Sequence, residues 1–303
     1  MGDTTTVRVE GRLLRLSNLD KVLYRGAGFT KAEVIDYYSR VAPVLLPHLA
    51  GRPATLRRYP DGVDGPSFYE KNVPRHAPEW VRTVRIETPG SARGNEYADF
   101  VVVEDLATLV WVANLAALEL HVPQWTVGPR GGRHSPDLLV FDLDPGLPAT
   151  IVECCRVAEL LRAELENDGV PVFAKTSGSK GMQLYAAVEV SSPERTSVYA
   201  KELAQRLARE FPELVVSTMA KAARPGKVLI DWSQNNPSKT TIAPYSLRAR
   251  ATPTASTPVS WDEVEACERP EDLSFVAEEV VVRVTHGGDL FTGLHDEPAR
   301  LPA

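Results

Sequence analysis

The sequence has few cysteines and no long hydrophobic run. Only three cysteines occur among the 303 residues, and two of them, Cys154 and Cys155, are adjacent. This number and spacing fit neither a disulfide framework nor a zinc motif, so we expect a reducing, cytoplasmic setting. No apolar stretch reaches the roughly 18 residues that a membrane-spanning helix needs. Residues 1–6 lack the basic and apolar regions of a secretory signal peptide, so we expect none, and no internal repeat is evident.

The chain also lacks the net positive charge that is typical of nucleic-acid-binding proteins. Its formal net charge is −6 at pH 7. The acids are concentrated, however, because residues 261–280 carry eight of them against the single base Arg269. Residues 217–250 carry six basic residues against Asp231 alone. A local basic belt permits binding to a polyanion without proving it, and we interpret the acidic segment as a soluble helical face.

The order of the expected elements indicates a mixed α/β fold. Thr30 with Glu33, and Thr150 with Glu153, form capping boxes at the start of two helices. From residue 138 onwards, the order strand–helix–strand–strand–helix–strand predicts a palm-like sheet covered by helices on one face. The expected helices cover residues 31–46, 106–118, 151–169 and 197–210. The expected strands include 170–174, 182–190, 214–217 and 227–232, with a β-meander over 82–104.

Two aspartates end an apolar strand at residues 138–146. Asp142 and Asp144 are separated by one residue, so in a strand they emerge on the same face while Leu143 points into the core. Two carboxylates this close repel each other unless a cation lies between them. Mg²⁺ and Mn²⁺ prefer such oxygen ligands. The pair therefore predicts a metal clamp for phosphoryl or nucleotidyl transfer, although solvated acids before a Pro-Gly turn have the same pattern.

A second apolar strand also ends in an acid, Asp231. If this strand lies beside the first, Asp231 becomes a third carboxylate next to Asp142 and Asp144. Three carboxylates can hold two ions about 3.5–4 Å apart. The alternative is a buried acid that is paired with a lysine or arginine.

Residues 176–181 form a Gly- and Ser-rich loop between two expected strands. Its small residues allow backbone N–H groups to approach a phosphate, and Lys180 supplies a positive charge. The loop is not a Walker motif, because the spacing and the following helix are missing. A plain hairpin remains the alternative. Further downstream, Gln234, Lys239 and Arg248 are polar residues of the kind that recognise base, sugar and triphosphate, although a solvated loop is the alternative for each of them taken singly.

Four ordered segments, residues 141–146, 176–181, 231–235 and 243–248, resemble the polymerase domain of bacterial ATP-dependent DNA ligase D. That family belongs to the archaeo-eukaryotic primase superfamily and acts in non-homologous end joining with Ku. The resemblance extends from Asn18 to about Arg250. It implies a primase–polymerase fold with a palm-like, RRM-like sheet that carries the acids. The implied parts are an N-terminal α/β lobe with a DNA 5′-phosphate pocket, a catalytic palm-like lobe and an acidic C-terminal segment, over residues 1–130, 131–260 and 261–303.

The resemblance also implies residue roles. The catalytic, metal-binding triad would be Asp142, Asp144 and Asp231, with two Mn²⁺ or Mg²⁺ ions. The nucleotide would be bound by Ser177, Lys180, Gln234, Arg248, His121 and Arg57. A 5′-phosphate across a gap would be bound by Asn18, Lys21 and Lys31, the template base by the stacked Phe68 and Tyr69, and a DNA end by Arg224. Core packing is the alternative for His121, Phe68 and Tyr69.

Two departures from the family accompany this resemblance. Gln183 stands where family members often carry histidine, and an amide cannot become charged, so a triphosphate contact there would be weaker. The K-x-D-G motif of the ligase domain is absent, so we expect either a free-standing relative or an excised domain.

The expected function is template-dependent nucleotidyl transfer that fills gaps or extends ends in double-strand break repair and prefers ribonucleotides. The expected partners are gapped or broken duplex DNA with a 5′-phosphate, nucleoside triphosphates, Ku and a DNA ligase, with no membrane. The expected location is the cytoplasm, with nucleoid association during repair. One alternative is a haloacid-dehalogenase-type phosphatase, although Gly146 replaces the usual Thr or Val. The other is a non-catalytic DNA-end scaffold.

Overall fold

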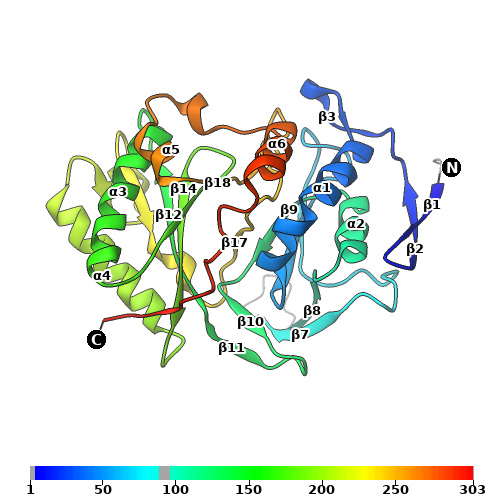
Figure 1. Ribbon diagram of the computed structural model, residues 1–303, viewed down its shortest axis with the longest axis horizontal. Coiled ribbons are helices and arrows are strands. Elements are labelled where there is room, and N and C mark those ends of the chain that lie inside the picture. The colour runs from blue at the N-terminus through cyan, green and yellow to red at the C-terminus, as the bar shows by residue number, and fades with distance from the viewer. Residues whose placement is uncertain (1–3, 89–95, 303) are drawn as a thin grey trace.

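The computed structural model describes residues 4–88 and 96–302, which form a mixed α/β fold around two large sheets (Figure 1). The six-stranded sheet has the order β17-β9-β5-β8-β7, with β6 also paired to β5. Helices α1 (Lys31–Leu49) and α2 (Leu106–Asn114) pack on it through a shared hydrophobic core. Its strands are β5 (Pro53–Arg58), β6 (Phe68–Glu70), β7 (Thr83–Glu87), β8 (Tyr97–Val102), β9 (Ala117–Val122) and β17 (Thr241–Ile242).

The local signals at the start of the helices are confirmed, and the largest difference from the prediction at a helix end is in α2. Both capping boxes, at Thr30 and at Thr150, are present. Helix α2 ends at Asn114, whereas the sequence predicted a helix up to residue 118. Ala116 has a φ of 57°, which breaks the helix, and residues 117–122 then form β9. The apolar run continues from helix into strand, so hydrophobicity alone does not mark this boundary.

Three short two-stranded sheets flank the six-stranded sheet. The first is an N-terminal hairpin, which lies at the edge of the molecule in Figure 1. Residues 82–104 contain the antiparallel pair β7–β8, and the predicted meander between these strands lies partly outside the described residues. The short strands are β1 (Thr4–Val9), β2 (Arg12–Ser17), β3 (Val22–Tyr24), β4 (Phe29–Thr30), β10 (Trp125–Val127) and β11 (Arg133–Pro136).

The seven-stranded sheet is covered by two helices on one face, as the sequence predicted. Leu139, Phe141 and Leu143 of β12 point to that face and pack with α3 (Ile151–Asn167) and α4 (Arg195–Glu210). The sheet order is β15-β16-β12-β14-β13-β18, with β19 paired to β14. Its strands are β12 (Leu138–Pro145), β13 (Phe173–Thr176), β14 (Met182–Glu189), β15 (Val215–Val216), β16 (Val228–Asp231), β18 (Pro258–Val259) and β19 (Ala299–Arg300).

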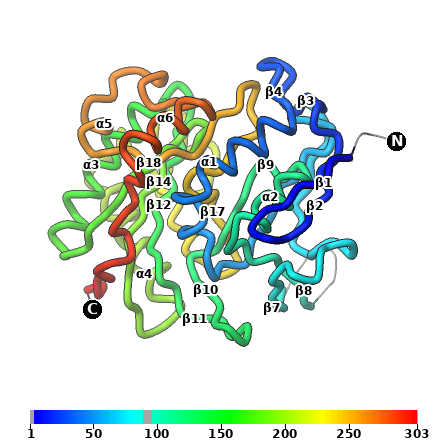
Figure 2. The backbone as a smooth tube through the Cα atoms, turned by 45° about the vertical axis from the view of Figure 1, so that its right-hand side comes forward, coloured from blue at the N-terminus to red at the C-terminus, as the bar shows by residue number. Residues whose placement is uncertain are grey.

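The opposite face of the seven-stranded sheet carries both apolar and acidic side chains. Leu138 and Val140 of β12 pack there against Phe291 and Leu294 of the C-terminal segment. Residues 142 and 144 continue the same alternation along β12, so their carboxylates lie on this face as well. In Figures 1 and 2 the C-terminal segment runs from α6 (Ala277–Gly287) between the two sheets to β19, beside β14.

The acidic segment 261–280 is part of the folded structure. Helix α5 (Trp261–Glu265), a 3₁₀ turn over Pro270–Leu273 and α6 contribute Val264, Leu273 and Val280 to the two cores. Glu263 pairs with Arg283 at 2.6 Å, and Glu278 pairs with Arg40 at 2.9 Å. No helix within the described ranges is both long enough and apolar enough to cross a bilayer.

Candidate active site

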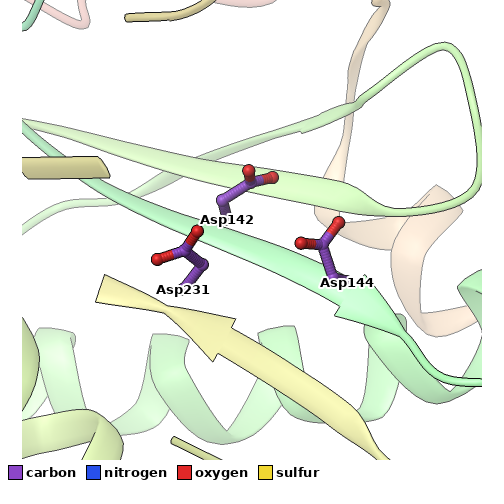
Figure 3. A group of neighbouring side chains, drawn as sticks. All are labelled: Asp142, Asp144 and Asp231. Carbon is purple, nitrogen blue, oxygen red and sulfur yellow. The ribbon is translucent and has the colours of Figure 1, made fainter. Parts of the chain in front are cut away.

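Asp142, Asp144 and Asp231 converge at the ends of two neighbouring strands (Figure 3). Strands β12 and β16 are antiparallel, and their register places Asp142 directly opposite Asp231. One carboxylate oxygen of each aspartate lies within 4.8 Å of the others. The predicted position of Asp231 beside the other two acids is therefore confirmed. The alternative of a buried acid paired with a lysine or arginine is wrong, because no such ion pair of Asp231 occurs among the described residues.

Burial and the neighbouring carboxylates raise the pKa of Asp142 and of Asp144. Burial, followed by the charges of Asp144 and Asp231, raises the pKa of Asp142 to about 7, against the opposing hydrogen bond from Gln183. Burial and the charge of Asp231 also raise the pKa of Asp144, although Arg224 and Arg248 lie near enough to oppose this. A site of this kind lacks positive charge. Three hard oxygen donors fit Mg²⁺ or Mn²⁺, so these residues are suited to hold such a cation.

The residues that follow Asp231 fix its carboxylate and close the strand. The backbone N–H and the hydroxyl of Ser233 donate to Asp231 Oδ1 at 3.0 and 2.6 Å, and Gln234 Nε2 donates to Oδ2 at 2.9 Å. Asn235 exchanges two hydrogen bonds with the backbone of Val140, at 2.9 and 2.7 Å. Its amide thus continues the β12 ladder after β16 ends. The sequence had predicted nucleotide recognition or a solvated loop for this polar stretch, and neither prediction included a role in the sheet.

Gln183 and Lys175 extend the row of the acids across the sheet. Gln183 of β14 lies opposite Asp142, and Lys175 of β13 lies opposite Gln183. Lys175 is fully buried, and burial lowers its pKa well below the usual range. The sequence did not identify Lys175, because the expected strand ended at residue 174. A lysine that continues an apolar strand was the available signal.

The Gly- and Ser-rich loop at residues 176–181 is held by the polar residues downstream. Arg248 Nη1 donates to the carbonyl of Ser177 at 3.0 Å, and Thr254 Oγ1 donates to that of Gly178 at 2.7 Å. Gly178 has a φ of 65°, and a Cβ there would lie 2.5 Å from the backbone of Ala255, so glycine is required. Lys180 is exposed and makes no ion pair within the described part of the chain.

A second buried acid, Glu119, gathers three of the predicted nucleotide-binding side chains. It is only 2% exposed, and its carboxylate lies 3.4 Å from Arg57, 3.4 Å from Arg248 and 3.0 Å from His121. The register of β6, β5 and β9 places Tyr69, Arg57 and Glu119 in one row. The sequence did not identify Glu119. Its signal was an acid in the middle of an apolar strand.

The electrostatics of Glu119 are opposite to those of the three aspartates. Burial opposes its charge, but the hydrogen bond from His121 and the charge of Arg248 outweigh burial and lower the pKa of Glu119 to about 2. Burial also lowers the pKa of His121. His121 packs edge-on against the ring of Tyr69, with centroids 5.8 Å apart, so this group links predicted nucleotide and template contacts.

The predicted 5′-phosphate residues lie together near the start of α1. Asn18 and Lys21 line an open cavity of about 630 Å³. Lys31 is the first residue of α1, where free N–H groups favour an anion, and its Nζ donates to the carbonyl of Ser17 at 2.7 Å. Burial, together with the charges of Lys21 and Arg58, lowers the pKa of Lys31 to about 8. No carboxylate pairs with Lys31 among the described residues.

The remaining predicted DNA contacts are at the surface. Phe68 and Tyr69 are 40% and 51% exposed, so the alternative of core packing does not hold for them. Their rings lie under Arg58 and Arg57, with guanidinium-to-centroid distances of 5.3 and 5.2 Å. Arg224 is half-buried in the loop that approaches the D-x-D turn, where Gly226 donates to the carbonyl of Gly146 at 2.9 Å.

Comparisons with known proteins agree with this geometry. Residues 30–291 match the family described as LigD, primase-polymerase domain. The chain belongs to this family. The polymerase domain from Mycobacterium tuberculosis ligase D in complex with DNA superposes with a TM-score of 0.86 at 41% identity, covering 94% of this chain and 99% of that one. The predicted primase–polymerase fold is thereby confirmed, and the phosphatase alternative is excluded.

Relatives with curated descriptions are LigD proteins that are longer than this chain. The multifunctional non-homologous end joining DNA repair protein LigD of Mycobacterium tuberculosis (strain ATCC 25618 / H37Rv) is 43% identical over 300 residues, which is 97% of this chain and 38% of the relative. The bifunctional non-homologous end joining protein LigD of Bacillus subtilis (strain 168) is 33% identical over 291 residues, which is 94% of this chain and 45% of the relative. The chain thus spans less than half the length of these LigD relatives.

Proposed function

We propose that this chain is a template-dependent nucleotidyltransferase that fills gaps or extends ends during non-homologous end joining. The observation that carries the proposal is the pairing of Asp142 with Asp231 across two strands, with Asp144 on the same face. Membership in the LigD primase-polymerase family supports the same reaction class. The primer 3′-hydroxyl attacks the α-phosphorus of a nucleoside triphosphate, a new phosphodiester forms, and pyrophosphate leaves.

The three aspartates would hold two divalent cations, Mn²⁺ or Mg²⁺. When bound, these cations lower the pKa of the attacking hydroxyl and neutralise charge on the leaving phosphates. The chain contributes positioning: Ser233 and Gln234 hold the carboxylate of Asp231 in place. Catalysis then comes from orientation and from charge stabilisation in the transition state.

The nucleotide would lie between the carboxylates and the Glu119 group. Lys180 and the backbone of the 176–181 loop would contact the triphosphate, with Ser177 and Arg248 forming one side of the site. Arg248 is already oriented by Glu119 and by the Ser177 carbonyl, so little side-chain entropy is lost on binding. His121, Arg57 and Gln234 would lie beside the base and sugar. A preference for ribonucleotides is part of the proposal.

DNA would bind along the six-stranded sheet. Asn18, Lys21 and Lys31 would take the 5′-phosphate on the far side of a gap. Phe68 and Tyr69 would stack on the template base, where exposed rings bind every base alike. Arg224 would hold the DNA end beside the carboxylates. Ku and a DNA ligase would be partners, with the nucleoid as the site of action, and the relatives named for non-homologous end joining support a role in that repair process.

Primer extension on a gapped duplex tests this function. With a 5′-phosphate at the gap, the purified protein should add nucleotides in the presence of Mn²⁺ or Mg²⁺, and ribonucleotides faster than deoxyribonucleotides. The absence of incorporation with either ion, over a range of nucleotides, would contradict the proposal.

The double variant Asp142→Ala/Asp144→Ala separates a polymerase from a non-catalytic scaffold. A polymerase loses incorporation but keeps 5′-phosphate-dependent DNA binding. A scaffold has no incorporation to lose, so the wild-type chain would bind gapped DNA without extending it.

A further inference from the structure

Four strands of the seven-stranded sheet carry a continuous row of polar side chains. The row runs from Asp231 through Asp142 and Gln183 to Lys175, each directly opposite the next. Residues opposite each other on antiparallel strands project to the same face, so these side chains are neighbours. Only the first two are in the carboxylate group that the family resemblance implies, and the other two have no role in the reaction described above.

Hydrogen bonds join Lys175 to the carboxylate of Asp142 through the amide of Gln183. Lys175 Nζ donates to Gln183 Oε1 at 2.6 Å, and Gln183 Nε2 donates to Asp142 Oδ1 at 3.0 Å. Behind them, Lys175 also donates to Ser256 Oγ at 2.6 Å, and Ser256 Oγ donates to the carbonyl of Thr176 at 2.8 Å. The chain of donors and acceptors therefore runs from the backbone to the acid without interruption.

The direction of every bond in this chain is fixed by chemistry. The Ser256 hydroxyl gives its proton to a carbonyl, so its oxygen accepts from Lys175. A charged lysine facing Gln183 must donate, and only Oε1 of the amide can accept. The amide nitrogen is then left facing Asp142. A neutral lysine is compatible with the same arrangement, because its amine has two N–H donors for the two acceptors.

The buried surroundings of these hydrogen-bonded side chains make their arrangement rigid. Lys175 and Gln183 are 0% and 4% exposed, and the Lys175 nitrogen lies 5.3 Å from the ring centroid of Tyr185. An unpaired amide oxygen in such surroundings costs free energy, so the arrangement resists rotation of the amide. Outer-shell hydrogen bonds of this kind orient a metal ligand and tune its affinity.

We propose that Lys175 and Gln183 form a positioning pair that orients the carboxylate of Asp142 for cation binding. Gln183 occupies Oδ1 of Asp142 and holds its plane, and Lys175 holds Gln183. Neither residue touches substrate. The consequence of this pair for catalysis rests on the proposed function. Its effect on cation affinity can be measured without nucleotide or DNA. The proposal also assigns Gln183 to the acids rather than to the triphosphate.

Binding of Mn²⁺ alone, followed by the electron paramagnetic resonance signal of the free ion, tests the pair. We expect Lys175→Met to weaken Mn²⁺ binding about tenfold, and Gln183→Leu to weaken it by a similar factor. The double variant Lys175→Met/Gln183→Leu should be no weaker than either single variant, because both changes break the same chain. Lys71→Met, the same change at an exposed lysine, is the matched control and should bind Mn²⁺ as the wild type does.

A rescue variant separates positioning from a structural role. In Lys175→Met/Gln183→His the imidazole donates to Asp142 without help from a lysine, and the hydroxyl of Tyr185, now 3.4 Å from Gln183 Oε1, is placed to donate to the other ring nitrogen. We expect Mn²⁺ affinity to return to within about threefold of wild type. In primer extension, Lys175→Met should lower kcat about tenfold while the KM for the nucleotide changes less than about twofold.

Several results would overturn the proposal. Equal Mn²⁺ affinity of Lys175→Met and wild type would do so. A loss of affinity in Lys175→Met that the double variant Lys175→Met/Gln183→His does not restore would also do so. These two variants share the buried Lys175→Met substitution, so a difference between them reports on the contact to Asp142. A wild-type chain that binds no Mn²⁺ would overturn the positioning pair and the metal site together. Intact Mn²⁺ binding without primer extension would count against the polymerase activity alone.

Discussion

Acidic side chains on the two large sheets have pKa shifts of opposite direction, although burial raises the pKa on both sheets. At Asp142, Asp144 and Asp231 the neighbours are other carboxylates, and the pKa of Asp142 rises to about 7. At Glu119 the neighbours are Arg57, Arg248 and His121, and the pKa falls to about 2. Burial raises the pKa at both places, so the charge of the partners decides the outcome.

This difference in neighbouring charge distinguishes the two roles: the aspartates are suited to bind a ligand, and Glu119 supports the side chains around it. The protein supplies Glu119 with its counter-charges, so Glu119 is complete and serves to hold the side chains around it. The aspartates lack a pairing cation within the described chain, and the proposed function assigns that place to a cation from solution. Both arrangements depend on a row of residues across neighbouring strands, Tyr69–Arg57–Glu119 in one sheet and Asp231–Asp142–Gln183–Lys175 in the other.

The largest effect is expected at the aspartates. Asp142→Asn should lower primer extension by roughly 1,000-fold, because a cation ligand and its charge are lost. The same variant should raise the melting temperature of the metal-free protein by a few degrees, since like-charge repulsion is relieved and the oxygen of the new amide still accepts from Gln183. Extension assays and thermal unfolding in a chelator measure the two effects. A lower melting temperature would contradict this view of the site.

The opposite change in melting temperature is expected at Glu119. Glu119→Gln leaves Arg57 and Arg248 without their buried counter-charge, which should cost about 3–5 kcal/mol of the free energy of unfolding. The KM for the nucleotide should also rise, because Arg248 and His121 lose their orientation. Thermal unfolding and steady-state kinetics provide the check. If Asp142→Asn and Glu119→Gln shifted the melting temperature in the same direction, the contrast between the two groups would fail.

Lys31 extends the comparison to a cation without a carboxylate partner. Lys31→Met should weaken the preference for a 5′-phosphate at the gap by about tenfold, measured as the ratio of the Kd values for DNA with and without that phosphate. Lys227→Met is the matched control, since Lys227 also donates to a backbone carbonyl, at 2.6 Å from Pro212. An unchanged ratio in Lys31→Met would remove this residue from the phosphate site.

The pH dependence of the same binding follows from the lowered pKa of Lys31. A phosphate favours the protonated amine, so the 5′-phosphate preference should be full below about pH 8 and should fall as pH rises above that value. Lys31→Met should show no such fall. Because the pKa is 10.5 when exposed and about 8 when folded, the unfolded chain binds more protons between these values, and the Lys31 contribution to stability rises over that range.

The smallest effect is expected for an uncharged contact. Phe68→Ala should weaken binding to gapped DNA by about 1 kcal/mol, roughly fivefold, because one stacking ring is lost and Tyr69 remains. The melting temperature should not change measurably, since the ring is 40% exposed. Titration of labelled DNA and thermal unfolding test both statements. A clear loss of stability would indicate that Phe68 serves the fold.

Local pattern was sufficient for some features of the fold and the site. The capping boxes at Thr30 and Thr150 depend on residues three positions apart, and the shared face of Asp142 and Asp144 depends on the alternation of a strand. Lys175 was missed because its strand extends two residues further than the sequence indicates. Glu119 was missed because its partners come from β5 and from the chain after β17.

The sequence by itself therefore determined which residue types stand at the ends of the strands and which of them share a face. Only the tertiary structure decided that Asp231 lies opposite Asp142, that Lys175 reaches Asp142 through Gln183, and that Glu119 is neutralised. The physical reason is that alternation within a strand is a property of the local backbone. Pairing between strands depends on long-range register, which the packing of the whole sheet fixes.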